Sequence, residues 1–403
     1  MAILLIGTLD TKGIEVAFVR ELLHSASLST LVMDAGVLQS PHFQPDIPRE
    51  DVYAAAGTSL QAVQQAADRG RAIEAAARGV AKIAVDLFNR GKVDGVLGLG
   101  GSAGTTIGTA AMRALAFGLP KLMVSTLASG QVRPYVGVRD ILMMPSVVDI
   151  SGLNRISRTV LTNAAHAMIG MVRQAHGPPP VGFEEKQLVT ATMFGVTTPC
   201  VEACRKIMEQ AGYEVLVFHA TGTGGMTMES FIKDGLISGV LDITSTELAD
   251  ELVGGVLSAG PDRLTAAGLG GVPQVISLGA LDMVNFGPPE TVPEKFRGRR
   301  FYQHNPTVTL MRTTPEENDR LGKEIAEKAS AARGPTCLLI PRRGISAIDA
   351  EGKPFWWPEA DAALFQSLRN WISPQVELIE LDLHINDPAF AEAATSKLLG
   401  VLK

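Results

Sequence analysis

The sequence has few cysteines, few aromatic residues and no excess of positive charge, and each shortage argues against a class of protein. Its three cysteines, Cys200, Cys204 and Cys337, are too few and odd in number for a disulfide framework. Aromatic residues make up only 5% of the 403 residues, which argues against a stacking platform for single-stranded nucleic acid. The formal net charge of −6 argues against a general nucleic-acid binder, although an acidic protein can still hold a phosphate locally.

Long apolar runs are missing as well. No run reaches the roughly 18 residues that a membrane-spanning helix needs. The apolar start of the chain, residues 2–9, ends at the charged residues Asp10 and Lys12 and has no basic segment before it. It therefore does not resemble a secretory signal. We therefore expect a cytoplasmic protein with no membrane partner and no nucleic-acid partner.

Glycine is the residue in excess, with 41 copies against the ~28 expected from an average content of about 7%. Hydrophobic residues make up 46% of the chain, which is enough for packed cores, and the length suggests two or three domains. The glycines cluster where apolar, strand-like segments meet helix-like segments. This alternation along the whole chain is typical of an α/β fold with a parallel sheet covered by helices.

The pattern restarts after a proline-rich segment, Gly177-Pro178-Pro179-Pro180, which cannot continue a helix. Four landmarks recur in the same order in the two halves: residues 7–8 and 195–196, 34–36 and 219–222, 94–97 and 238–241, and 118–120 and 271–273. We therefore expect two Rossmann-like parallel-sheet α/β domains that are copies of one unit, at residues 1–177 and 184–403, with a linker at 178–183. Chance recurrence of glycine-rich turns is the other interpretation.

The strongest chemical signal is the segment Gly98-Leu99-Gly100-Gly101-Ser102-Ala103-Gly104-Thr105-Thr106. Glycines allow backbone N–H groups to turn toward an anion, and the N-terminus of the following helix adds the positive end of a dipole. It is not a Walker A motif, because no Lys-Ser/Thr follows its last glycine, and Ala103 breaks the Gly-x-Gly-x-x-Gly pattern. The segment predicts a phosphate or carboxylate site, with a tight packing turn as the alternative. Its candidate ligand-binding residues are Gly100, Gly101, Ser102, Gly104, Thr105 and Thr106.

A second segment, residues 7–13, also follows a strand and opens a helix. Lys12 is suited to reach a phosphate as a point charge, and Asp10 to orient a metal-bound water or a ribose hydroxyl. Because ligands bind at the carboxyl ends of strands in an open α/β sheet, we expect this segment and residues 98–106 to lie on one edge. Asp34, after the second strand, is predicted either to accept from a ribose hydroxyl or to be an ordinary turn residue. The further candidates are therefore Gly7, Thr8, Asp10, Thr11, Lys12 and Asp34.

In the second half, polar residues again follow the predicted strands. His219, Glu247, Asp282 and His304 are candidates for acid–base catalysis or for metal ligation at one shared site. They lack the spacing of a metal motif such as His-Glu-x-x-His, and an isolated histidine at a strand end is more often structural. A transition metal therefore stays open as an alternative without support from spacing.

Together these segments resemble the Tm-1-like ATP-binding family, also called UPF0261. The resemblance is carried by residues 7–12, 68–70, 98–105, 125–130 and 219–226, and it covers essentially the whole chain. It implies a two-domain α/β protein whose N-terminal domain binds ATP, with Mg²⁺. The plant member that gives the family its name blocks tobamovirus RNA replication and carries an additional C-terminal barrel domain. Because this sequence ends before such a barrel, we do not expect the antiviral activity here.

The resulting hypothesis is an ATP-binding metabolic enzyme whose C-terminal domain acts on a small acidic substrate, with His219 or Glu247 as the acid–base group. Two alternatives are a metal-assisted hydrolase or lyase centred on the C-terminal domain, and a non-catalytic module in which the nucleotide controls binding to another protein. A homodimer is the expected assembly.

Overall fold

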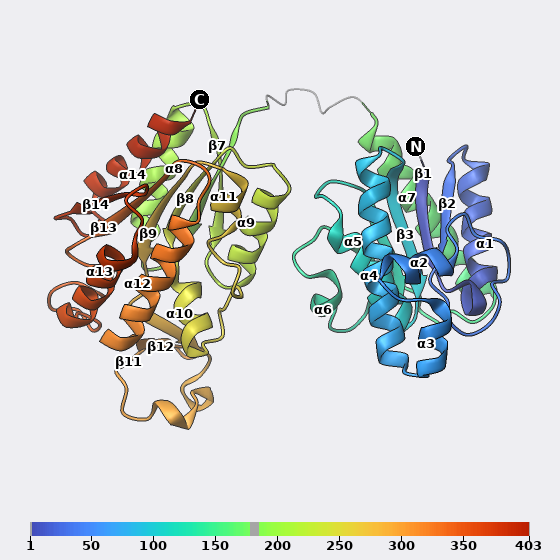
Figure 1. Cartoon of the computed structure of the whole chain (residues 1–403), viewed down its shortest axis with the longest axis horizontal. Coiled ribbons are helices and arrows are strands. Elements are labelled where there is room, and N and C mark those ends of the chain that lie inside the picture. Colours follow the sequence, from blue (N-terminus) through green and yellow to red (C-terminus); the bar gives the residue numbers. More distant parts are fainter. Residues whose placement is uncertain (1, 178–184, 403) are drawn as a thin grey trace. The chain divides into compact units, whose positions relative to one another are not determined.

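The computed structural model describes residues 2–177 and 185–402, and the chain divides into two compact units, Met1–Phe183 and Glu184–Lys403 (Figure 1). We call them the N-terminal and the C-terminal domain. Each contains a parallel sheet with helices on both faces, which confirms the predicted fold class. The linker expected at residues 178–183 lies outside the described residues. No helix in the described part of the chain is long and apolar enough to cross a membrane.

The N-terminal domain has a five-stranded sheet in the order β2-β1-β3-β4-β5. Strand β1 reads as a continuous apolar run because helices cover both faces of the sheet: Ile3 and Leu5 pack with α1 and α7, whereas Leu4 and Ile6 pack with α2, α4 and α5. The elements in chain order are β1 (Ala2–Gly7), α1 (Leu9–Ser25), β2 (Thr30–Asp34), α2 (Arg49–Ala55), α3 (Leu60–Ala66), α4 (Arg69–Asn89), β3 (Val93–Gly100), α5 (Ser102–Ala114), β4 (Lys121–Ser125), α6 (Arg133–Val136), β5 (Leu142–Pro145) and α7 (Arg155–Ala175).

Helix α4 shows how the local sequence sets the boundaries of an element. Asp68 caps its N-terminus by accepting a hydrogen bond from the Arg71 N–H at 3.1 Å. Just beyond its C-terminus, Gly91 adopts a positive φ of 65°. Within the helix, a Cβ at Gly79 would lie 2.0 Å from the carbonyl oxygen of Val52, so glycine is what allows α2 to pack closely on α4.

The C-terminal domain has a six-stranded parallel sheet in the order β14-β13-β9-β8-β6-β7. Helices α8 and α14 cover one face of it, and α9, α11, α12 and α13 pack on the other. The elements are β6 (Leu188–Met193), α8 (Thr198–Gln210), β7 (Glu214–His219), α9 (Thr223–Lys233), β8 (Gly239–Thr244), α10 (Thr246–Val253), α11 (Ala266–Gly270), β9 (Gln274–Gly279), β10 (Met283–Phe286), β11 (Phe301–Asn305), β12 (Val308–Arg312), α12 (Pro315–Ser330), β13 (Thr336–Pro341), α13 (Pro358–Trp371), β14 (Glu377–Leu381) and α14 (Pro388–Val401).

The two parallel sheets share their strand order. When β6 to β9 are matched with β1 to β4, both sheets place the second strand outside the first, followed by the third and the fourth. The four landmark pairs found in the sequence fall beside matching strands. The repeat seen in the sequence is therefore a repeat of topology.

An antiparallel sheet in the order β10-β12-β11 interrupts this repeat between β9 and β13. This sheet was not predicted from the sequence. Its strands have only four or five residues, and β11 is largely exposed, so they carry a weak pattern of alternating hydrophobicity.

Candidate functional site

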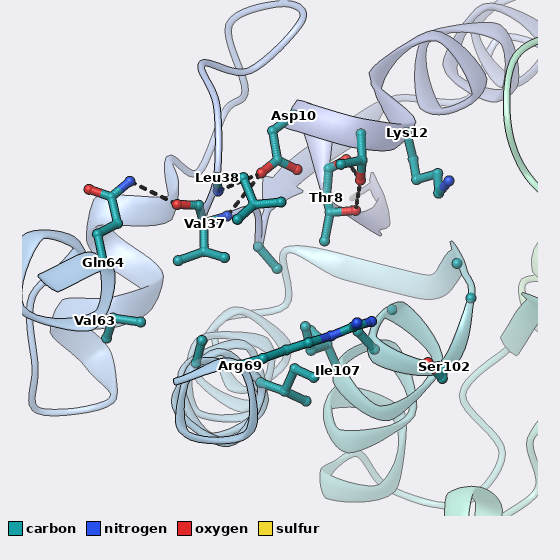
Figure 2. Close-up of a pocket in the computed structure, with 18 of the residues that line it drawn as sticks. Thr8, Asp10, Lys12, Val37, Leu38, Val63, Gln64, Arg69, Ser102 and Ile107 are labelled. Carbon is teal, nitrogen blue, oxygen red and sulfur yellow. Dashed lines mark hydrogen bonds between the residues drawn. The ribbon is translucent and has the colours of Figure 1, made fainter. Parts of the chain in front are cut away.

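A cavity of about 810 Å³ lies in the N-terminal domain at the carboxyl ends of β1 and β3 (Figure 2). The strand order changes direction between these strands, since β2 lies on one side of β1 whereas β3, β4 and β5 lie on the other. Open α/β sheets bind ligands at such a point, because the loops that follow the two strands diverge there. The lining includes eight of the residues predicted from the sequence: Thr8, Asp10, Thr11, Lys12, Gly100, Gly101, Ser102 and Gly104.

The N-terminus of α5 is the part of the cavity best suited to an anion. Within the described part of the chain, no acceptor is hydrogen-bonded to the backbone N–H groups of Ser102, Ala103 and Gly104. The first bond of this helix runs from the Thr105 N–H to the carbonyl of Gly101 at 2.8 Å, and Gly101 has no side chain with which to cap the others. Free N–H groups and the positive end of the helix dipole together favour a phosphate or a carboxylate.

Gly100 shows why this segment is rich in glycine. A Cβ at this position would lie 2.7 Å from the Cα of Gly104, so the end of β3 and the first turn of α5 are in backbone contact. The segment is therefore a tight packing turn, and that turn is also what leaves the N–H groups of α5 facing the cavity. The two interpretations of the sequence are compatible here.

At the N-terminus of α1, the second predicted anion site, the domain itself supplies acceptors for three of the first four N–H groups. The Leu9 N–H donates to Asp34 Oδ1 at 2.9 Å, and the N–H groups of Thr11 and Lys12 donate to the carbonyl of Thr8. Asp34 is fully buried, does not line the cavity, and has its pKa raised by that burial. This corrects the expectation of a ribose contact at Asp34, whose carboxylate holds the start of α1 instead.

Asp10 and Lys12 line the cavity, but the protein itself engages their side chains. Asp10 Oδ2 accepts from the N–H groups of Val37 at 3.1 Å and Leu38 at 2.8 Å, so it holds the loop that follows β2. The ammonium group of Lys12 donates to the carbonyl of Ile150, and in Figure 2 it points away from Asp10 and Leu38. A ligand phosphate would have to replace this bond in order to pair with Lys12.

Three other predicted residues shape the loops without lining the cavity. A Cβ at Gly7 would lie 2.7 Å from Val16 Cγ2, so this glycine lets α1 pack on β1. The Thr105 hydroxyl shares a 2.6 Å hydrogen bond with Ser125 Oγ inside the domain. The Thr106 hydroxyl donates to a backbone carbonyl of its own helix at 3.0 Å.

The four acid–base candidates of the C-terminal domain lie in separate surroundings. His219 is exposed at the end of β7, where its ring lies 5.4 Å from that of Phe194. His304 is exposed in β11, within the antiparallel sheet. Glu247 and Asp282 are fully buried, each beside a different arginine. These contacts correct the expectation that the four side chains converge on one site.

Glu247 belongs to a network around the fully buried Arg263. The Nε of Arg263 donates to Glu247 Oε2 at 2.6 Å, and its two terminal nitrogens donate to the carboxylate of Asp242 at 2.5 and 2.6 Å. Glu247 Oε1 accepts from the N–H groups of Gly222 and Gly225, at the start of α9. Burial raises the pKa of Glu247, and the adjacent Arg263 opposes that shift. The carboxylate of Glu247 therefore occupies the anion position of this loop and is not free for acid–base catalysis.

The comparisons with known proteins agree with this two-domain structure. Residues 1–177 match the N-terminal domain, and residues 186–402 the C-terminal domain, of the "Uncharacterised protein family (UPF0261)". The chain belongs to the UPF0261 family. The UPF0261 protein of Clostridium tetani is 51% identical over 402 residues, which cover 100% of this chain and 99% of that protein. The UPF0261 protein RA0729 of Rhizobium meliloti is 49% identical over 396 residues, which cover 98% of this chain and 97% of that protein.

A plant relative of this UPF0261 protein is longer. The "ToMV resistance protein Tm-1(GCR237)" of Solanum lycopersicum is 40% identical over 415 residues, which cover 98% of this chain and 55% of the tomato protein. The resemblance to the Tm-1-like family is thus confirmed. Among solved structures, the UDP-N-acetylglucosamine 2-epimerase of Rickettsia bellii covers 99% of this chain, with 10% identity and a TM-score of 0.23.

The cavity has four further polar lining residues that were not selected as site residues from the sequence: Tyr53, Gln64, Asp68 and Arg69. Figure 2 shows the side chain of Arg69 extending from α4 toward α5, and no described residue pairs with its guanidinium group. Gln64 Nε2 donates to the carbonyl of Val37 at 2.8 Å. Asp68 and Arg69 had a signal in the sequence, because both belong to the family segment at residues 68–70.

The residues that line the cavity of the N-terminal domain do not form a Mg²⁺ site by themselves. Asp10 uses one carboxylate oxygen to hold the loop after β2, and its other oxygen is buried against Gly36. Asp68, the other carboxylate that we find in the lining, caps α4 and contacts Arg71. Mg²⁺ needs accessible oxygen ligands, so it would have to arrive on the ligand's phosphates. In residues 2–177 and 185–402, no group of three or more His, Cys, Asp or Glu side chains is placed to hold a metal ion.

Asp282 belongs to a second buried network in the C-terminal domain of this UPF0261 protein. Its Oδ2 accepts from the Ser346 hydroxyl at 2.8 Å, while the buried Arg312 pairs with Asp361 at 2.5 Å and with Asp349 at 3.5 Å. Burial raises the pKa of Asp282 to about 8 and that of Asp361 to about 7, and Asp349 adds to both shifts. One arginine cannot neutralise three buried carboxylates. Some of these carboxyl groups therefore stay protonated at neutral pH.

We expect the free energy of unfolding of the C-terminal domain to fall as the pH rises from about 5 to about 8. The folded state holds protons on Asp282 and Asp361 that the unfolded state has released above its ordinary pKa of 3.8. Each extra proton contributes a slope of about 1.4 kcal/mol per pH unit. Urea unfolding followed by tryptophan fluorescence measures this slope, because Trp356, Trp357 and Trp371 all lie in this domain. Asp282→Asn should reduce the dependence of the free energy of unfolding on pH. An unchanged slope would show that other groups hold these protons.

Proposed function

We propose that the N-terminal domain of this UPF0261 protein binds a nucleotide, with ATP as the candidate, and that the protein is a metabolic enzyme. The observation that carries the nucleotide proposal is the order of chemical groups along the cavity at the ends of β1 and β3. The family resemblance, which implies ATP, is the second line of support.

One end of the cavity is polar and the other is more apolar. The polar end holds the free N–H groups at the start of α5 and the guanidinium group of Arg69. The more apolar end is lined by Val37, Leu38 and Val63, with Gln64 beside them (Figure 2). Figure 2 shows the guanidinium group of Arg69 between Ser102 on one side and Val37 and Val63 on the other. A nucleotide has the same order of phosphates, sugar and base, and a volume of about 810 Å³ lies in the range of small-molecule sites.

The proposal assigns a small acidic substrate to the C-terminal domain. Arg343 there pairs with Asp382, and Arg369 pairs with Glu380 at 2.7 Å. Guanidinium groups bind carboxylates and phosphates in this geometry, and a substrate carboxylate would take the place of one of these exposed protein carboxylates. The cavity beside them has a volume of about 880 Å³ and is lined by Arg342, Arg343, Arg369, Asp361 and His384, among others.

Calorimetric titration of the full chain with ATP, with and without Mg²⁺, tests the nucleotide proposal. A ligand present at a hundred times its Kd stabilises the folded state by about 2.7 kcal/mol, so we also expect a higher melting temperature of the N-terminal domain. Binding heat and a raised melting temperature support the proposal. The absence of both, in either condition, contradicts it.

We expect Arg69→Gln to weaken nucleotide binding about tenfold, because a charge-assisted contact to phosphate would be lost. Arg69 is the first residue of α4, where a cation opposes the helix dipole, so its removal should not destabilise the domain. Arg71→Gln is the matched control, since Arg71 lies on the same helix with its side chain 81% exposed and does not line the cavity. Titration of both variants with ATP measures the difference, and equal affinities would exclude Arg69 from the site.

A further inference from the structure

Tyr53 is a buried polar side chain that faces the cavity without a partner of its own. It lies in α2, is only 1% exposed, and lines the cavity. Among the residues that the structure describes, none is hydrogen-bonded to its hydroxyl group. Its ring packs in the core with Met33, Ala75 and Ala76, which fixes the direction of the hydroxyl. A hydroxyl that faces a cavity without a protein partner is open to a ligand, and an acceptor on that ligand would gain a hydrogen bond from it.

The surroundings of Tyr53 determine which part of a ligand can lie there. Burial raises the pKa of Tyr53 to about 12, with Asp10 and Asp34 adding to the shift and Arg49 opposing it. The hydroxyl therefore keeps its proton at neutral pH and acts as a donor. The same two carboxylates disfavour a phosphate beside Tyr53, because like charges repel. The ligand group at this position is therefore polar and uncharged.

In a nucleotide, the polar uncharged group between the phosphates and the base is the sugar. The phosphate end of the cavity lies at the start of α5, and the apolar end is lined by Val37, Leu38 and Val63. We infer that the Tyr53 hydroxyl donates a hydrogen bond to a ribose hydroxyl of the bound nucleotide, so that the site selects ribonucleotides over deoxyribonucleotides. This inference rests on the proposed nucleotide binding and adds the group that discriminates between sugars.

The test compares ATP, 2′-deoxy-ATP, 3′-deoxy-ATP and inorganic tripolyphosphate by calorimetric titration of the full chain. We expect the wild-type protein to bind ATP about tenfold more tightly than at least one deoxy analogue. In Tyr53→Phe this preference should disappear because ATP binding weakens about tenfold, while affinity for tripolyphosphate stays at the wild-type level. Tyr135→Phe is the matched control, since Tyr135 belongs to the same domain and does not line the cavity. It should keep the wild-type preference.

The possible outcomes distinguish a failure of sugar selection by Tyr53 from a failure of nucleotide binding. Equal affinity of the wild-type protein for ATP and both deoxy analogues would overturn sugar selection and leave nucleotide binding intact. A persistent preference in Tyr53→Phe would overturn the role of Tyr53, since another residue would then contact the sugar. A loss of tripolyphosphate binding in Tyr53→Phe would also overturn it, because the substitution would have disturbed the phosphate end. If neither ATP nor tripolyphosphate binds the wild-type protein, the proposed function fails and the inference fails with it.

Discussion

Replacement of Arg263 by methionine is expected to destabilise the C-terminal domain by about 3–5 kcal/mol. Arg263 is fully buried and donates to Glu247 and Asp242, with Glu229 at 3.4 Å as a third carboxylate. Methionine has a similar length but no charge, so the substitution would leave these carboxylates buried without their cation. The loss is large because an uncompensated buried charge is far more costly than the absence of an exposed ion pair.

Urea unfolding followed by tryptophan fluorescence measures this effect selectively, because the three tryptophans of the chain lie in the C-terminal domain. Arg205→Met is the matched control: Arg205 pairs with Glu202 and Glu209 along α8, but its side chain is 34% exposed. We expect little change in this variant, since water can replace both pairs. Similar midpoints for the two variants would show that the Arg263 network does not contribute to stability as its burial predicts.

Gly100→Ala is expected to have the largest effect in the N-terminal domain, on ligand binding and stability together. The added Cβ would lie 2.7 Å from the Cα and 3.1 Å from the carbonyl carbon of Gly104, and backbone atoms cannot rotate out of the way. The first turn of α5 must shift to accommodate it, which we expect to cost about 1–3 kcal/mol of stability. That turn carries the free N–H groups of the cavity, so nucleotide binding should weaken by more than the roughly tenfold loss expected for Arg69→Gln.

Thermal unfolding followed by circular dichroism, together with titration with ATP, measures both effects. Gly170→Ala is the matched control, because Gly170 lies within α7 and a Cβ there meets no atom within 4 Å. We expect this control to be stabilised by about 0.5–1 kcal/mol, since alanine loses less entropy than glycine in a helix. If Gly100→Ala matches the wild-type protein in both measurements, the contact between β3 and α5 does not define the site.

Most of the fold could be predicted from the sequence because its signals are local. Apolar runs, the Asp68 cap and the glycine-rich turns each act within a few residues, and together they indicated parallel α/β domains with a repeated order of landmarks. The antiparallel sheet of β10, β11 and β12 was missed because short, partly exposed strands are specified mainly by their neighbours in the sheet.

The candidate site was predicted less completely, since its chemistry depends on contacts between distant segments. Asp34 was a candidate for a ribose contact, beside the alternative of a turn residue, because it follows a strand; it lies buried and accepts from the Leu9 N–H. Glu247 was assigned to catalysis for the same reason, yet it binds Arg263 and the N–H groups of the α9 loop. Tyr53, in a short helix without a motif, gave no signal, although the structure places it in the wall of the cavity.

The sequence by itself determined that this is a two-domain α/β protein of the UPF0261 family with glycine-rich loops at the carboxyl ends of its strands. Only the tertiary structure decided which of those loops has free N–H groups. At the start of α5 the N–H groups are free, whereas at the start of α1 Asp34 and Thr8 accept from three of the first four, and the α9 loop binds Glu247. The physical reason is that a buried N–H group takes whichever acceptor the fold brings to it, and the order of strands in the sheet sets that acceptor.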